Sequence, residues 1–196
     1  MPRPDVSAER KPQILQAAAQ VFLQKGFNAT HMKDIARQAG LSVGNLYRYF
    51  PAKLDISLAL MSFFLEPSTQ MLESLPSQPG SVRQRLQQAF TEELEVETSV
   101  ELTLYSEMYH LAHSEPRIRE LLTQYNQRSQ QSMAALLRQG IERGEIRPIE
   151  PDLIAFCLQA IFDGFMQNLR LLPDGVSRAE LIEKTFDTFF EGLNPY

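Results

Sequence analysis

The chain has 196 residues, of which 43% are hydrophobic and 22% are charged, and its net charge is −5. These values are typical of a globular protein with one or two domains, and the single cysteine, Cys157, excludes an intramolecular disulfide framework and a CxxC metal or redox site. The most apolar stretch, residues 56–65, is too short to span a membrane, and residues 1–10 do not have the apolar core of a signal peptide. We therefore expect a cytoplasmic protein with no membrane partner.

The charge is distributed unevenly along the chain. Residues 1–53 hold eight Lys or Arg against three Asp or Glu, a balance of +5, whereas residues 54–196 hold eleven against twenty-one, a balance of −10. Such asymmetry indicates a polyanion-binding head on an acidic body that repels nucleic acid.

Helical periodicity begins near the N-terminus. Apolar residues recur at helical spacing over about residues 12–25, and Gly26 is suited to end that helix. Thr30 is a candidate N-cap for a second helix that ends at Gly40, and Ser42 is a candidate N-cap for a short third helix.

The remaining segments are also helical in pattern. A helix is predicted from residue 52 to about residue 75, with Pro67 as a kink or break, and residues 74–81 are the best candidate linker. Further helices are predicted at about 82–96, 98–114, 116–143, 151–172 and 178–192. The predicted fold is all-α with about nine helices: a three-helix domain at residues 1–53 and a larger helical domain at residues 54–196.

Residues 30–50 have the layout of a helix-turn-helix. Ala36 is small enough for close helix packing, Gly40 can adopt the left-handed conformation of the turn, and Leu41 can fill the corner between the helices. The alternative is that Gly40 is only a helix cap and that the nearby tyrosines belong to the core. The complete spacing, together with the basic charge confined to this segment, favours the helix-turn-helix.

The third helix is the candidate recognition helix. A helical wheel turns Val43, Leu46 and Phe50 inward, Gly44, Asn45 and Arg48 outward, and Tyr47 and Tyr49 to the margins. Outward Asn and Arg side chains can form bidentate hydrogen bonds to adenine and guanine edges in the major groove. The tyrosine hydroxyls and Lys53 are suited to phosphates, which fix the register without reading sequence.

At these residues the sequence resembles the DNA-binding domain of the tetracycline-repressor (TetR) family of bacterial transcription regulators. The matching pieces are Ile14-Leu15-x-Ala17-Ala18 with Phe22 and Lys25-Gly26-Phe27, then Ala29-Thr30-x3-Asp34-Ile35-Ala36, then Ala39-Gly40-Leu41-Ser42-x-Gly44-x-Leu46-Tyr47-x-Tyr49-Phe50-x2-Lys53. The resemblance implies phosphate contacts from Thr30, Tyr47, Tyr49 and Lys53, and base-facing positions at Ser42, Val43, Gly44, Asn45 and Arg48. Position 45 departs from the small or hydroxylated residues common there, and position 48 departs from the frequent His. Both departures suggest an operator sequence particular to this protein.

The last two helices are the candidate dimer interface. The helix at 151–172 is apolar nearly all round, so it must bury more than one face, and a small domain has too little interior to cover both helices. The resemblance also implies a dimer made by these helices, and Gly164 would allow close approach. The alternative is that both helices are central core. The predicted interface residues are Phe156, Ile161, Phe162, Gly164, Phe165, Phe186, Phe189 and Phe190.

The resemblance further implies an inducer pocket surrounded by the fourth to seventh helices. Aromatic and thioether side chains suit planar apolar ligands, although such a set can also be plain core. The candidates are Met61, Phe64, Tyr105, Met108, Tyr109, His110, Tyr125 and Met133. Glu107 beside Tyr105 and Tyr109 would suit a cationic ligand. Glu107, His110 and His113 have a spacing that allows a metal site to be imagined, but we predict no metal and no other cofactor.

Together with the resemblance, these patterns predict a homodimeric repressor that leaves a pseudo-palindromic DNA operator when an unknown small-molecule inducer binds. We expect no enzymatic activity, because the sequence contains no Gly-rich phosphate loop, GxSxG or HExxH motif. The alternatives are a helical protein-binding adaptor and a ligand-independent regulator with a sealed core.

Overall fold

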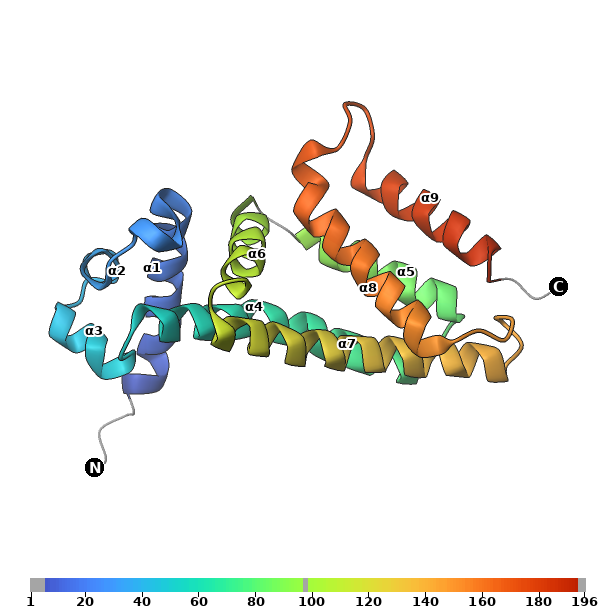
Figure 1. Ribbon diagram of the computed structural model, residues 1–196, viewed down its shortest axis with the longest axis horizontal. Coiled ribbons are helices and arrows are strands. Elements are labelled where there is room, and N and C mark those ends of the chain that lie inside the picture. Colours follow the sequence, from blue (N-terminus) through green and yellow to red (C-terminus); the bar gives the residue numbers. More distant parts are fainter. Residues whose placement is uncertain (1–5, 97–98, 194–196) are drawn as a thin grey trace. The chain divides into compact units, whose positions relative to one another are not determined.

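The computed structural model describes residues 6–96 and 99–193, and the regular elements in that part of the chain are all helices (Figure 1). In chain order they are α1 (Val6–Ala29), α2 (Met32–Gln38), α3 (Val43–Tyr49), α4 (Lys53–Ser74), η1 (Leu75–Ser77), α5 (Val82–Val96), α6 (Ser99–Ala112), α7 (Pro116–Glu142), α8 (Pro151–Asn168), η2 (Leu169–Leu171) and α9 (Arg178–Glu191). The predicted all-α fold is confirmed, with nine α-helices in the described ranges. None of the described helices is long and apolar enough to cross a membrane.

The chain forms two compact units. The first comprises residues 1–64 and 99–121, and the second comprises residues 65–98 and 122–196, so α4 and α7 contribute residues to both. The predicted linker at 74–81 falls inside the second unit. The predicted division of function at residue 53 stays a prediction.

The core of the first unit lies among α1, α2, α3 and the start of α4. Helices α2 and α3 pack on α1 and on each other, and α6 packs on α1. The core residues share nearly complete burial and come mainly from the apolar stripes of these helices: Ile14, Ala18, Ala19, Val21, Phe22, Ile35, Ala36, Leu46, Phe50, Ile56, Leu60 and Leu104. This packing, and not helix propensity, holds two seven-residue helices that would be unstable alone.

The turn between α2 and α3 has the predicted chemistry, whereas the start of α2 differs from the prediction. Gly40 has φ +65°, the left-handed conformation that a side chain disfavours, and Leu41 packs against the core. The N-cap of α2 is His31 and not Thr30, because the His31 backbone N–H donates to the Asp34 carboxylate at 3.1 Å in a capping box.

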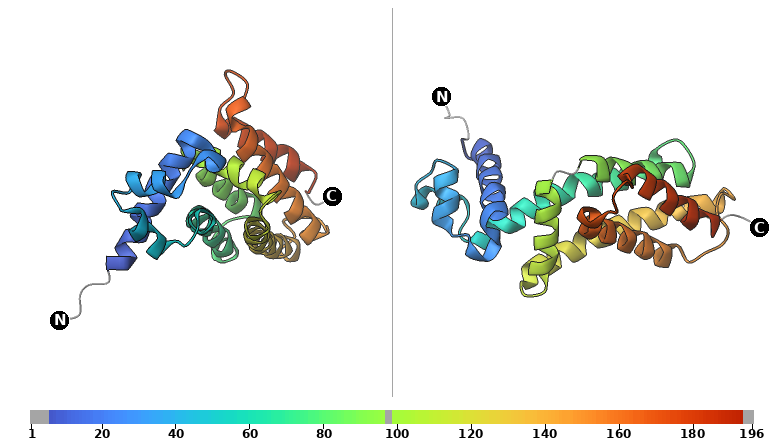
Figure 2. Two further views of the ribbon diagram at one scale, coloured as in Figure 1. Left: turned by 60° about the vertical axis from the view of Figure 1, so that its left-hand side comes forward. Right: turned by 90° about the horizontal axis from the view of Figure 1, so that it is seen from above.

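In the second unit, α5 lies beside α9, and α8 runs antiparallel to α9 (Figures 1 and 2). The Phe90 ring of α5 meets Phe162 and Phe186 edge-on, with ring centroids 5.3 and 5.1 Å apart. Phe186 and Phe190 stack on each other and are buried within the single chain. Both residues were predicted at the dimer interface, which the structure contradicts because their surfaces are already covered within the chain.

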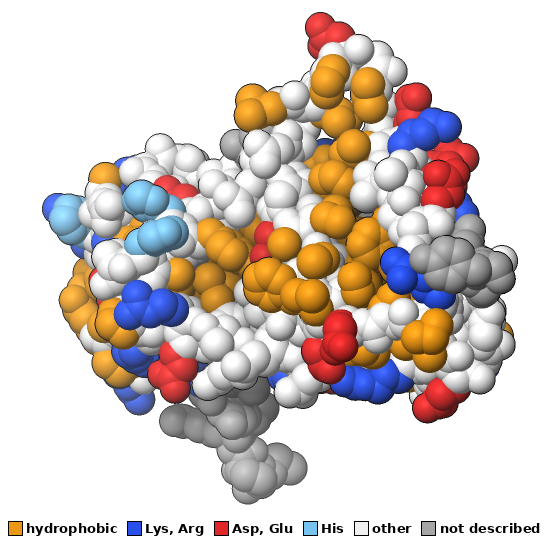
Figure 3. Space-filling model, turned by 45° about the vertical axis from the view of Figure 1, so that its right-hand side comes forward, with side chains coloured by type: hydrophobic (Ala, Val, Ile, Leu, Met, Phe, Trp, Pro, Cys, Tyr) orange, Lys and Arg blue, Asp and Glu red, His pale blue; other side chains and the backbone are white. Residues whose placement is uncertain are grey.

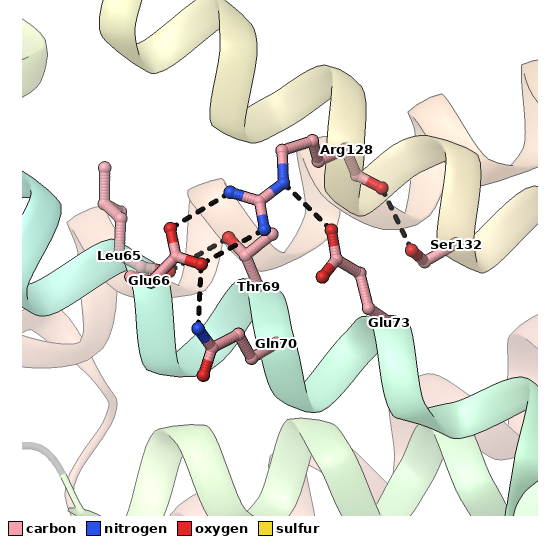
Figure 4. Close-up of polar contacts among 7 residues, drawn as sticks. All are labelled: Leu65, Glu66, Thr69, Gln70, Glu73, Arg128 and Ser132. Carbon is pink, nitrogen blue, oxygen red and sulfur yellow. Dashed lines mark hydrogen bonds and ion pairs between the residues drawn. The ribbon is translucent and has the colours of Figure 1, made fainter.

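Helix α4 continues through Pro67 to Ser74, so of the predicted kink or break the structure excludes the break. In the second unit, an Arg128-centred cluster ties this part of α4 to α7 (Figure 4). Arg128 donates to both carboxylate oxygens of Glu66, at 3.0 and 3.1 Å, and to Glu73 at 2.9 Å. The hydrogen bonds from Arg128 lower the pKa of Glu66 to about 2. Pro67 cannot donate a backbone hydrogen bond within the helix. The contacts of Arg128 with Glu66 and Glu73 therefore stabilise α4 on both sides of this missing bond.

A second arginine, Arg85 of α5, is buried with 2% of its surface exposed. Its Nη1 donates to the carbonyls of Leu75 and Pro76, at 2.9 and 3.3 Å, and to Gln139 Oε1 at 3.3 Å. Its Nε and Nη2 are buried without a hydrogen-bond partner. Arg85 therefore holds η1 against α5 and α7, but three of its N–H groups are unsatisfied.

Candidate nucleic-acid interface

One face of α3 is exposed and carries the predicted base-facing residues. Ser42 caps the helix by accepting a hydrogen bond from the Asn45 backbone N–H at 3.2 Å. Leu46 is fully buried and fixes the helix to the core, whereas Asn45 and Arg48 point to solvent. Val43, which the helical wheel turned inward, is 40% exposed, since the helix is anchored mainly through Leu46 and Phe50.

The start of α3 is open to a close approach. Ser42 and Gly44 are exposed, and a Cβ placed on Gly44 would have no atom within 4 Å. The absence of a side chain at Gly44 leaves the backbone accessible to a large partner. Together with the flanking Asn45 and Arg48, this surface has the shape and the hydrogen-bonding groups of a recognition helix.

The predicted phosphate contacts divide into two groups. Tyr47 is 48% exposed and Tyr49 is half-buried against the core, so both hydroxyls stay candidates. Thr30 has no exposed surface, and its hydroxyl donates to the Gly26 carbonyl at 2.7 Å. The structure thus contradicts a phosphate contact from the Thr30 side chain, because its hydroxyl is enclosed and already bonded.

Lys53 is also occupied within the protein. Its ammonium lies 2.6 Å from the Phe27 carbonyl, 2.9 Å from the Thr30 carbonyl and 3.5 Å from the Asn28 carbonyl, and it sits 4.1 Å from the Phe27 ring centroid. Burial lowers the pKa of Lys53. An ammonium has three N–H donors, and these contacts use all of them. Lys53 therefore stabilises the end of α1, which contradicts its predicted contact with a phosphate.

Other basic side chains supply positive charge to this part of the first unit. Lys25 forms an ion pair with Asp34 at 2.9 Å, and Arg37 approaches the same carboxylate at 3.4 Å. The hydrogen bond from Lys25 lowers the pKa of Asp34. Lys11 and Lys33 are exposed. These four basic side chains outnumber the one carboxylate that pairs with them, and the excess of positive charge favours a phosphate backbone.

The predicted pocket residues belong to both compact units. Met61 and Met108 line a cavity of about 20 Å³ in the first unit, room for about one water molecule, with Phe22, Phe27, Ser57, Leu60, Leu104, Glu107 and Leu111. Tyr105 and Tyr109 pair through their hydroxyls at 3.2 Å, and His110 is exposed. Phe64 packs on the core of the first unit, whereas Tyr125 and Met133 belong to the second unit.

Glu107 makes a contact that the sequence did not predict. Its carboxylate turns toward α1 and accepts the Phe27 backbone N–H at 2.9 Å. His113 Nδ1 instead lies 3.0 Å from the Tyr109 carbonyl oxygen. Within the described residues, no group of three His, Cys, Asp or Glu side chains has the arrangement of a metal site.

The sequence matches two protein families. Residues 14–60 match "Bacterial regulatory proteins, tetR family", and residues 82–193 match "BetI-type transcriptional repressor, C-terminal". Among curated proteins, it is 28% identical over 148 residues to the transcriptional repressor KstR2 of Mycobacterium tuberculosis H37Rv, covering 74% of each chain. It is 25% identical over 199 residues to the regulator TtgR of Pseudomonas putida, covering 94% of this chain and 91% of TtgR.

Solved structures have the same fold. The choline complex of a transcriptional regulator from Saccharomonospora viridis matches with a TM-score of 0.79 at 22% identity, over 94% of this chain and 96% of that one. The helix-turn-helix geometry and the two family matches, one of which spans more than half of the chain, agree. The chain belongs to the TetR family of bacterial transcription regulators, which are DNA-binding proteins and not enzymes, and it carries a BetI-type C-terminal domain.

Proposed function

We propose that this protein is a homodimeric repressor that binds a pseudo-palindromic DNA operator through α3 and is released by a small-molecule inducer. Residues 1–53 would bind DNA, and residues 54–196 would bind the inducer and form the dimer. The observation that carries the proposal is the exposed face of α3, where Asn45 and Arg48 stand beside the open position of Gly44.

On this proposal, α3 enters the major groove. Arg48 donates two hydrogen bonds to a guanine edge, and Asn45 pairs with an adenine edge. Tyr47 donates to a phosphate and fixes the register, as does the positive charge of Lys11 and Lys33. One short helix reads few base pairs, so two copies held about 34–36 Å apart are needed to read successive major grooves of one site.

The exposed face of α8 supports the proposed dimer. Leu153 and Phe156 are 60% and 57% exposed, and Ala160 and Gly164 continue the same helical stripe with small residues. Hydrophobic side chains gather at the surface in the region of α8 and the loop to α9 (Figure 3). Ile161, Phe162, Phe165 and Phe189 are half-buried, and Phe162 packs on Phe90 of α5. Pairing two such faces across a two-fold axis would remove this apolar surface from water.

Two observations on other proteins support repression and ligand binding. KstR2 is named a repressor, and the Saccharomonospora viridis regulator binds choline in its solved structure. An inducer that prefers one of two states of the protein weakens operator binding by its difference in affinity, commonly about 1–3 kcal/mol. The small cavity beside Met61 and Met108 favours, as a second candidate, a ligand-independent regulator with a sealed core.

The first experiment is selection of duplexes from a random-sequence pool by the wild-type protein. We expect enrichment of a pseudo-palindrome whose affinity falls steeply with salt, because each neutralised phosphate releases counterions. Sedimentation should give a dimer for the wild type and a monomer for Phe156→Asp, with Gln131→Asp on the exposed surface of α7 as the control. Failure to enrich any sequence, or a monomeric wild type, would contradict the proposal.

A titration with choline then separates the two candidates. Loss of duplex binding at saturating choline, together with choline binding in calorimetry, would support an inducible repressor. Unchanged duplex binding with bound choline would support the ligand-independent regulator.

A further inference from the structure

The end of α1 is held by two charged side chains from distant parts of the first unit. Glu107 of α6 accepts the backbone N–H of Phe27 at 2.9 Å, eighty positions away in the sequence. Lys53, at the start of α4, donates to the carbonyls of Phe27 and Thr30 at 2.6 and 2.9 Å. In the short segment of residues 26–30, the carboxylate therefore binds a backbone N–H group and the ammonium binds backbone carbonyl groups.

The contact with Glu107 depends on a glycine. Gly26 interrupts the helical geometry of α1 with φ +73° and ψ 164°, a conformation almost confined to glycine. A Cβ placed on Gly26 would lie 3.2 Å from Glu107 Oε1. The bare backbone thus lets the carboxylate approach closely enough to accept the Phe27 N–H. A hydrogen bond to an ionised acceptor is about twice as strong as a neutral one.

The segment of residues 26–30 is directly followed by α2 and α3, the helices of the helix-turn-helix. Residues 26–30 are followed by the His31 cap of α2, and α2 packs on α3. The Thr30 hydroxyl links the two ends of the segment by donating a hydrogen bond to the Gly26 carbonyl at 2.7 Å. A displacement of α6 would therefore pull on the backbone that positions the helix-turn-helix.

The Glu107 side chain also borders adaptable side chains. It lines the cavity of about 20 Å³ next to Met61 and Met108, and both thioether side chains can change rotamer at low cost. A rotamer change of Met61 or Met108 would let the carboxylate leave Phe27. The structure contains the closed arrangement of the link between α6 and α1.

We propose that Glu107 is a positioning residue for DNA binding: its hydrogen bond to the Phe27 amide fixes the helix-turn-helix against α6 and transmits movement of α6 to operator affinity. This inference rests on the proposed function. It also explains why Lys53 is directed inward, since the ammonium holds the carbonyl side of the same segment while Glu107 holds the amide side.

The test compares two substitutions of similar size. Glu107→Gln keeps an oxygen that accepts the Phe27 N–H, whereas Glu107→Met keeps the length of the side chain and removes the acceptor. With the duplex enriched by the wild-type protein, we expect Glu107→Gln to bind within about twofold of the wild type and Glu107→Met to bind about 5–10-fold more weakly. Amide hydrogen exchange at Phe27 should accelerate in Glu107→Met and change little in Glu107→Gln.

The control is Ile146→Ala, which removes a buried side chain of the second unit. It should lower the melting temperature at least as much as Glu107→Met and leave the duplex affinity of the folded protein unchanged. Equal binding by Glu107→Met and the wild type, or equal weakening by Ile146→Ala, would overturn the proposal. Unchanged amide exchange at Phe27 in Glu107→Met would also overturn the proposal, and this measurement needs no DNA. Failure of the wild type to bind any duplex would refute the proposed function separately.

Discussion

Replacing the buried Arg85 by methionine should stabilise the protein. The guanidinium is charged at any physiological pH, and the buried Nε and Nη2 have no hydrogen-bond partner. Burial lowers the pKa of Arg85 but leaves the group far from deprotonation. Each unsatisfied buried donor atom costs about 1–3 kcal/mol. Arg85→Met removes both of these penalties and fills a similar volume with a flexible apolar side chain.

The hydrogen bonds lost in Arg85→Met cost little, because the backbone carbonyls that accept from Arg85 each keep a second donor. Leu75 O still accepts Gln78 N at 3.1 Å, and Pro76 O still accepts Gln139 Nε2 at 3.2 Å. The substitution therefore forfeits about one hydrogen bond to a charged group, about 1.5–3 kcal/mol. We expect a net stabilisation of about 1–3 kcal/mol, or an increase of about 2–4 °C in melting temperature for each kcal/mol.

Urea unfolding followed by circular dichroism measures this change directly. The control is Arg83→Met on the same helix, because Arg83 is partly exposed and pairs with Asp187. Losing that exposed pair should lower stability slightly, by about 0–1 kcal/mol. An Arg85→Met variant less stable than Arg83→Met would refute the reasoning, since it would mean that the buried charge has compensation that the geometry does not contain.

Two further predictions concern the second unit. Arg128 lowers the pKa of Glu66 in the folded protein to about 2 from the ordinary value of 4.5. The ionised Glu66 carboxylate therefore contributes its full stabilisation above pH 4.5 and loses it as the pH falls through 2. The stability difference between the wild type and Glu66→Gln should therefore be largest at pH 6 and shrink at pH 3, and a constant difference in urea unfolding would count against this account. Gly140→Ala should lower the melting temperature, because the new Cβ would lie 2.7 Å from Val82 Cγ2 and 2.8 Å from Ile146 Cδ1. The cost of overpacking, about 1–3 kcal/mol, then exceeds the gain in helix propensity of at most about 1 kcal/mol, and an unchanged or higher melting temperature would contradict it.

Local patterns in the sequence predicted the helices well. Apolar periodicity and glycine positions gave the bounds of α5 and α7 within a residue, and Gly26 and Gly40 have the positive φ that ends a helix. The N-cap of α2 was missed by one position because His31 caps through its backbone, which no side-chain preference reveals. The pattern left open whether α4 continues through Pro67, since Arg128, which stabilises α4 there, lies sixty-two positions from Glu66.

Long-range contacts account for the errors at the site. Lys53 was assigned to phosphates because its position and charge suit them, but its partners are carbonyls more than twenty positions earlier. Glu107 was considered with its sequence neighbours Tyr109 and His110, although its partner is Phe27 on another helix. Such pairings depend on how helices pack, and a single sequence contains no direct signal for them. The exposed face of α3 was easier to predict because one short helix defines it.

The most direct test of the account is selection from a random duplex pool by Arg48→Ala in parallel with the wild type. The exposed Arg48 should read one base in each half-site, at a cost of about 1–3 kcal/mol when it is removed. The account predicts that both proteins enrich pseudo-palindromes of the same spacing and that the variant loses its preference at one symmetric pair of positions. Identical enriched sequences for the two proteins, or a preference lost in one half-site only, would contradict it.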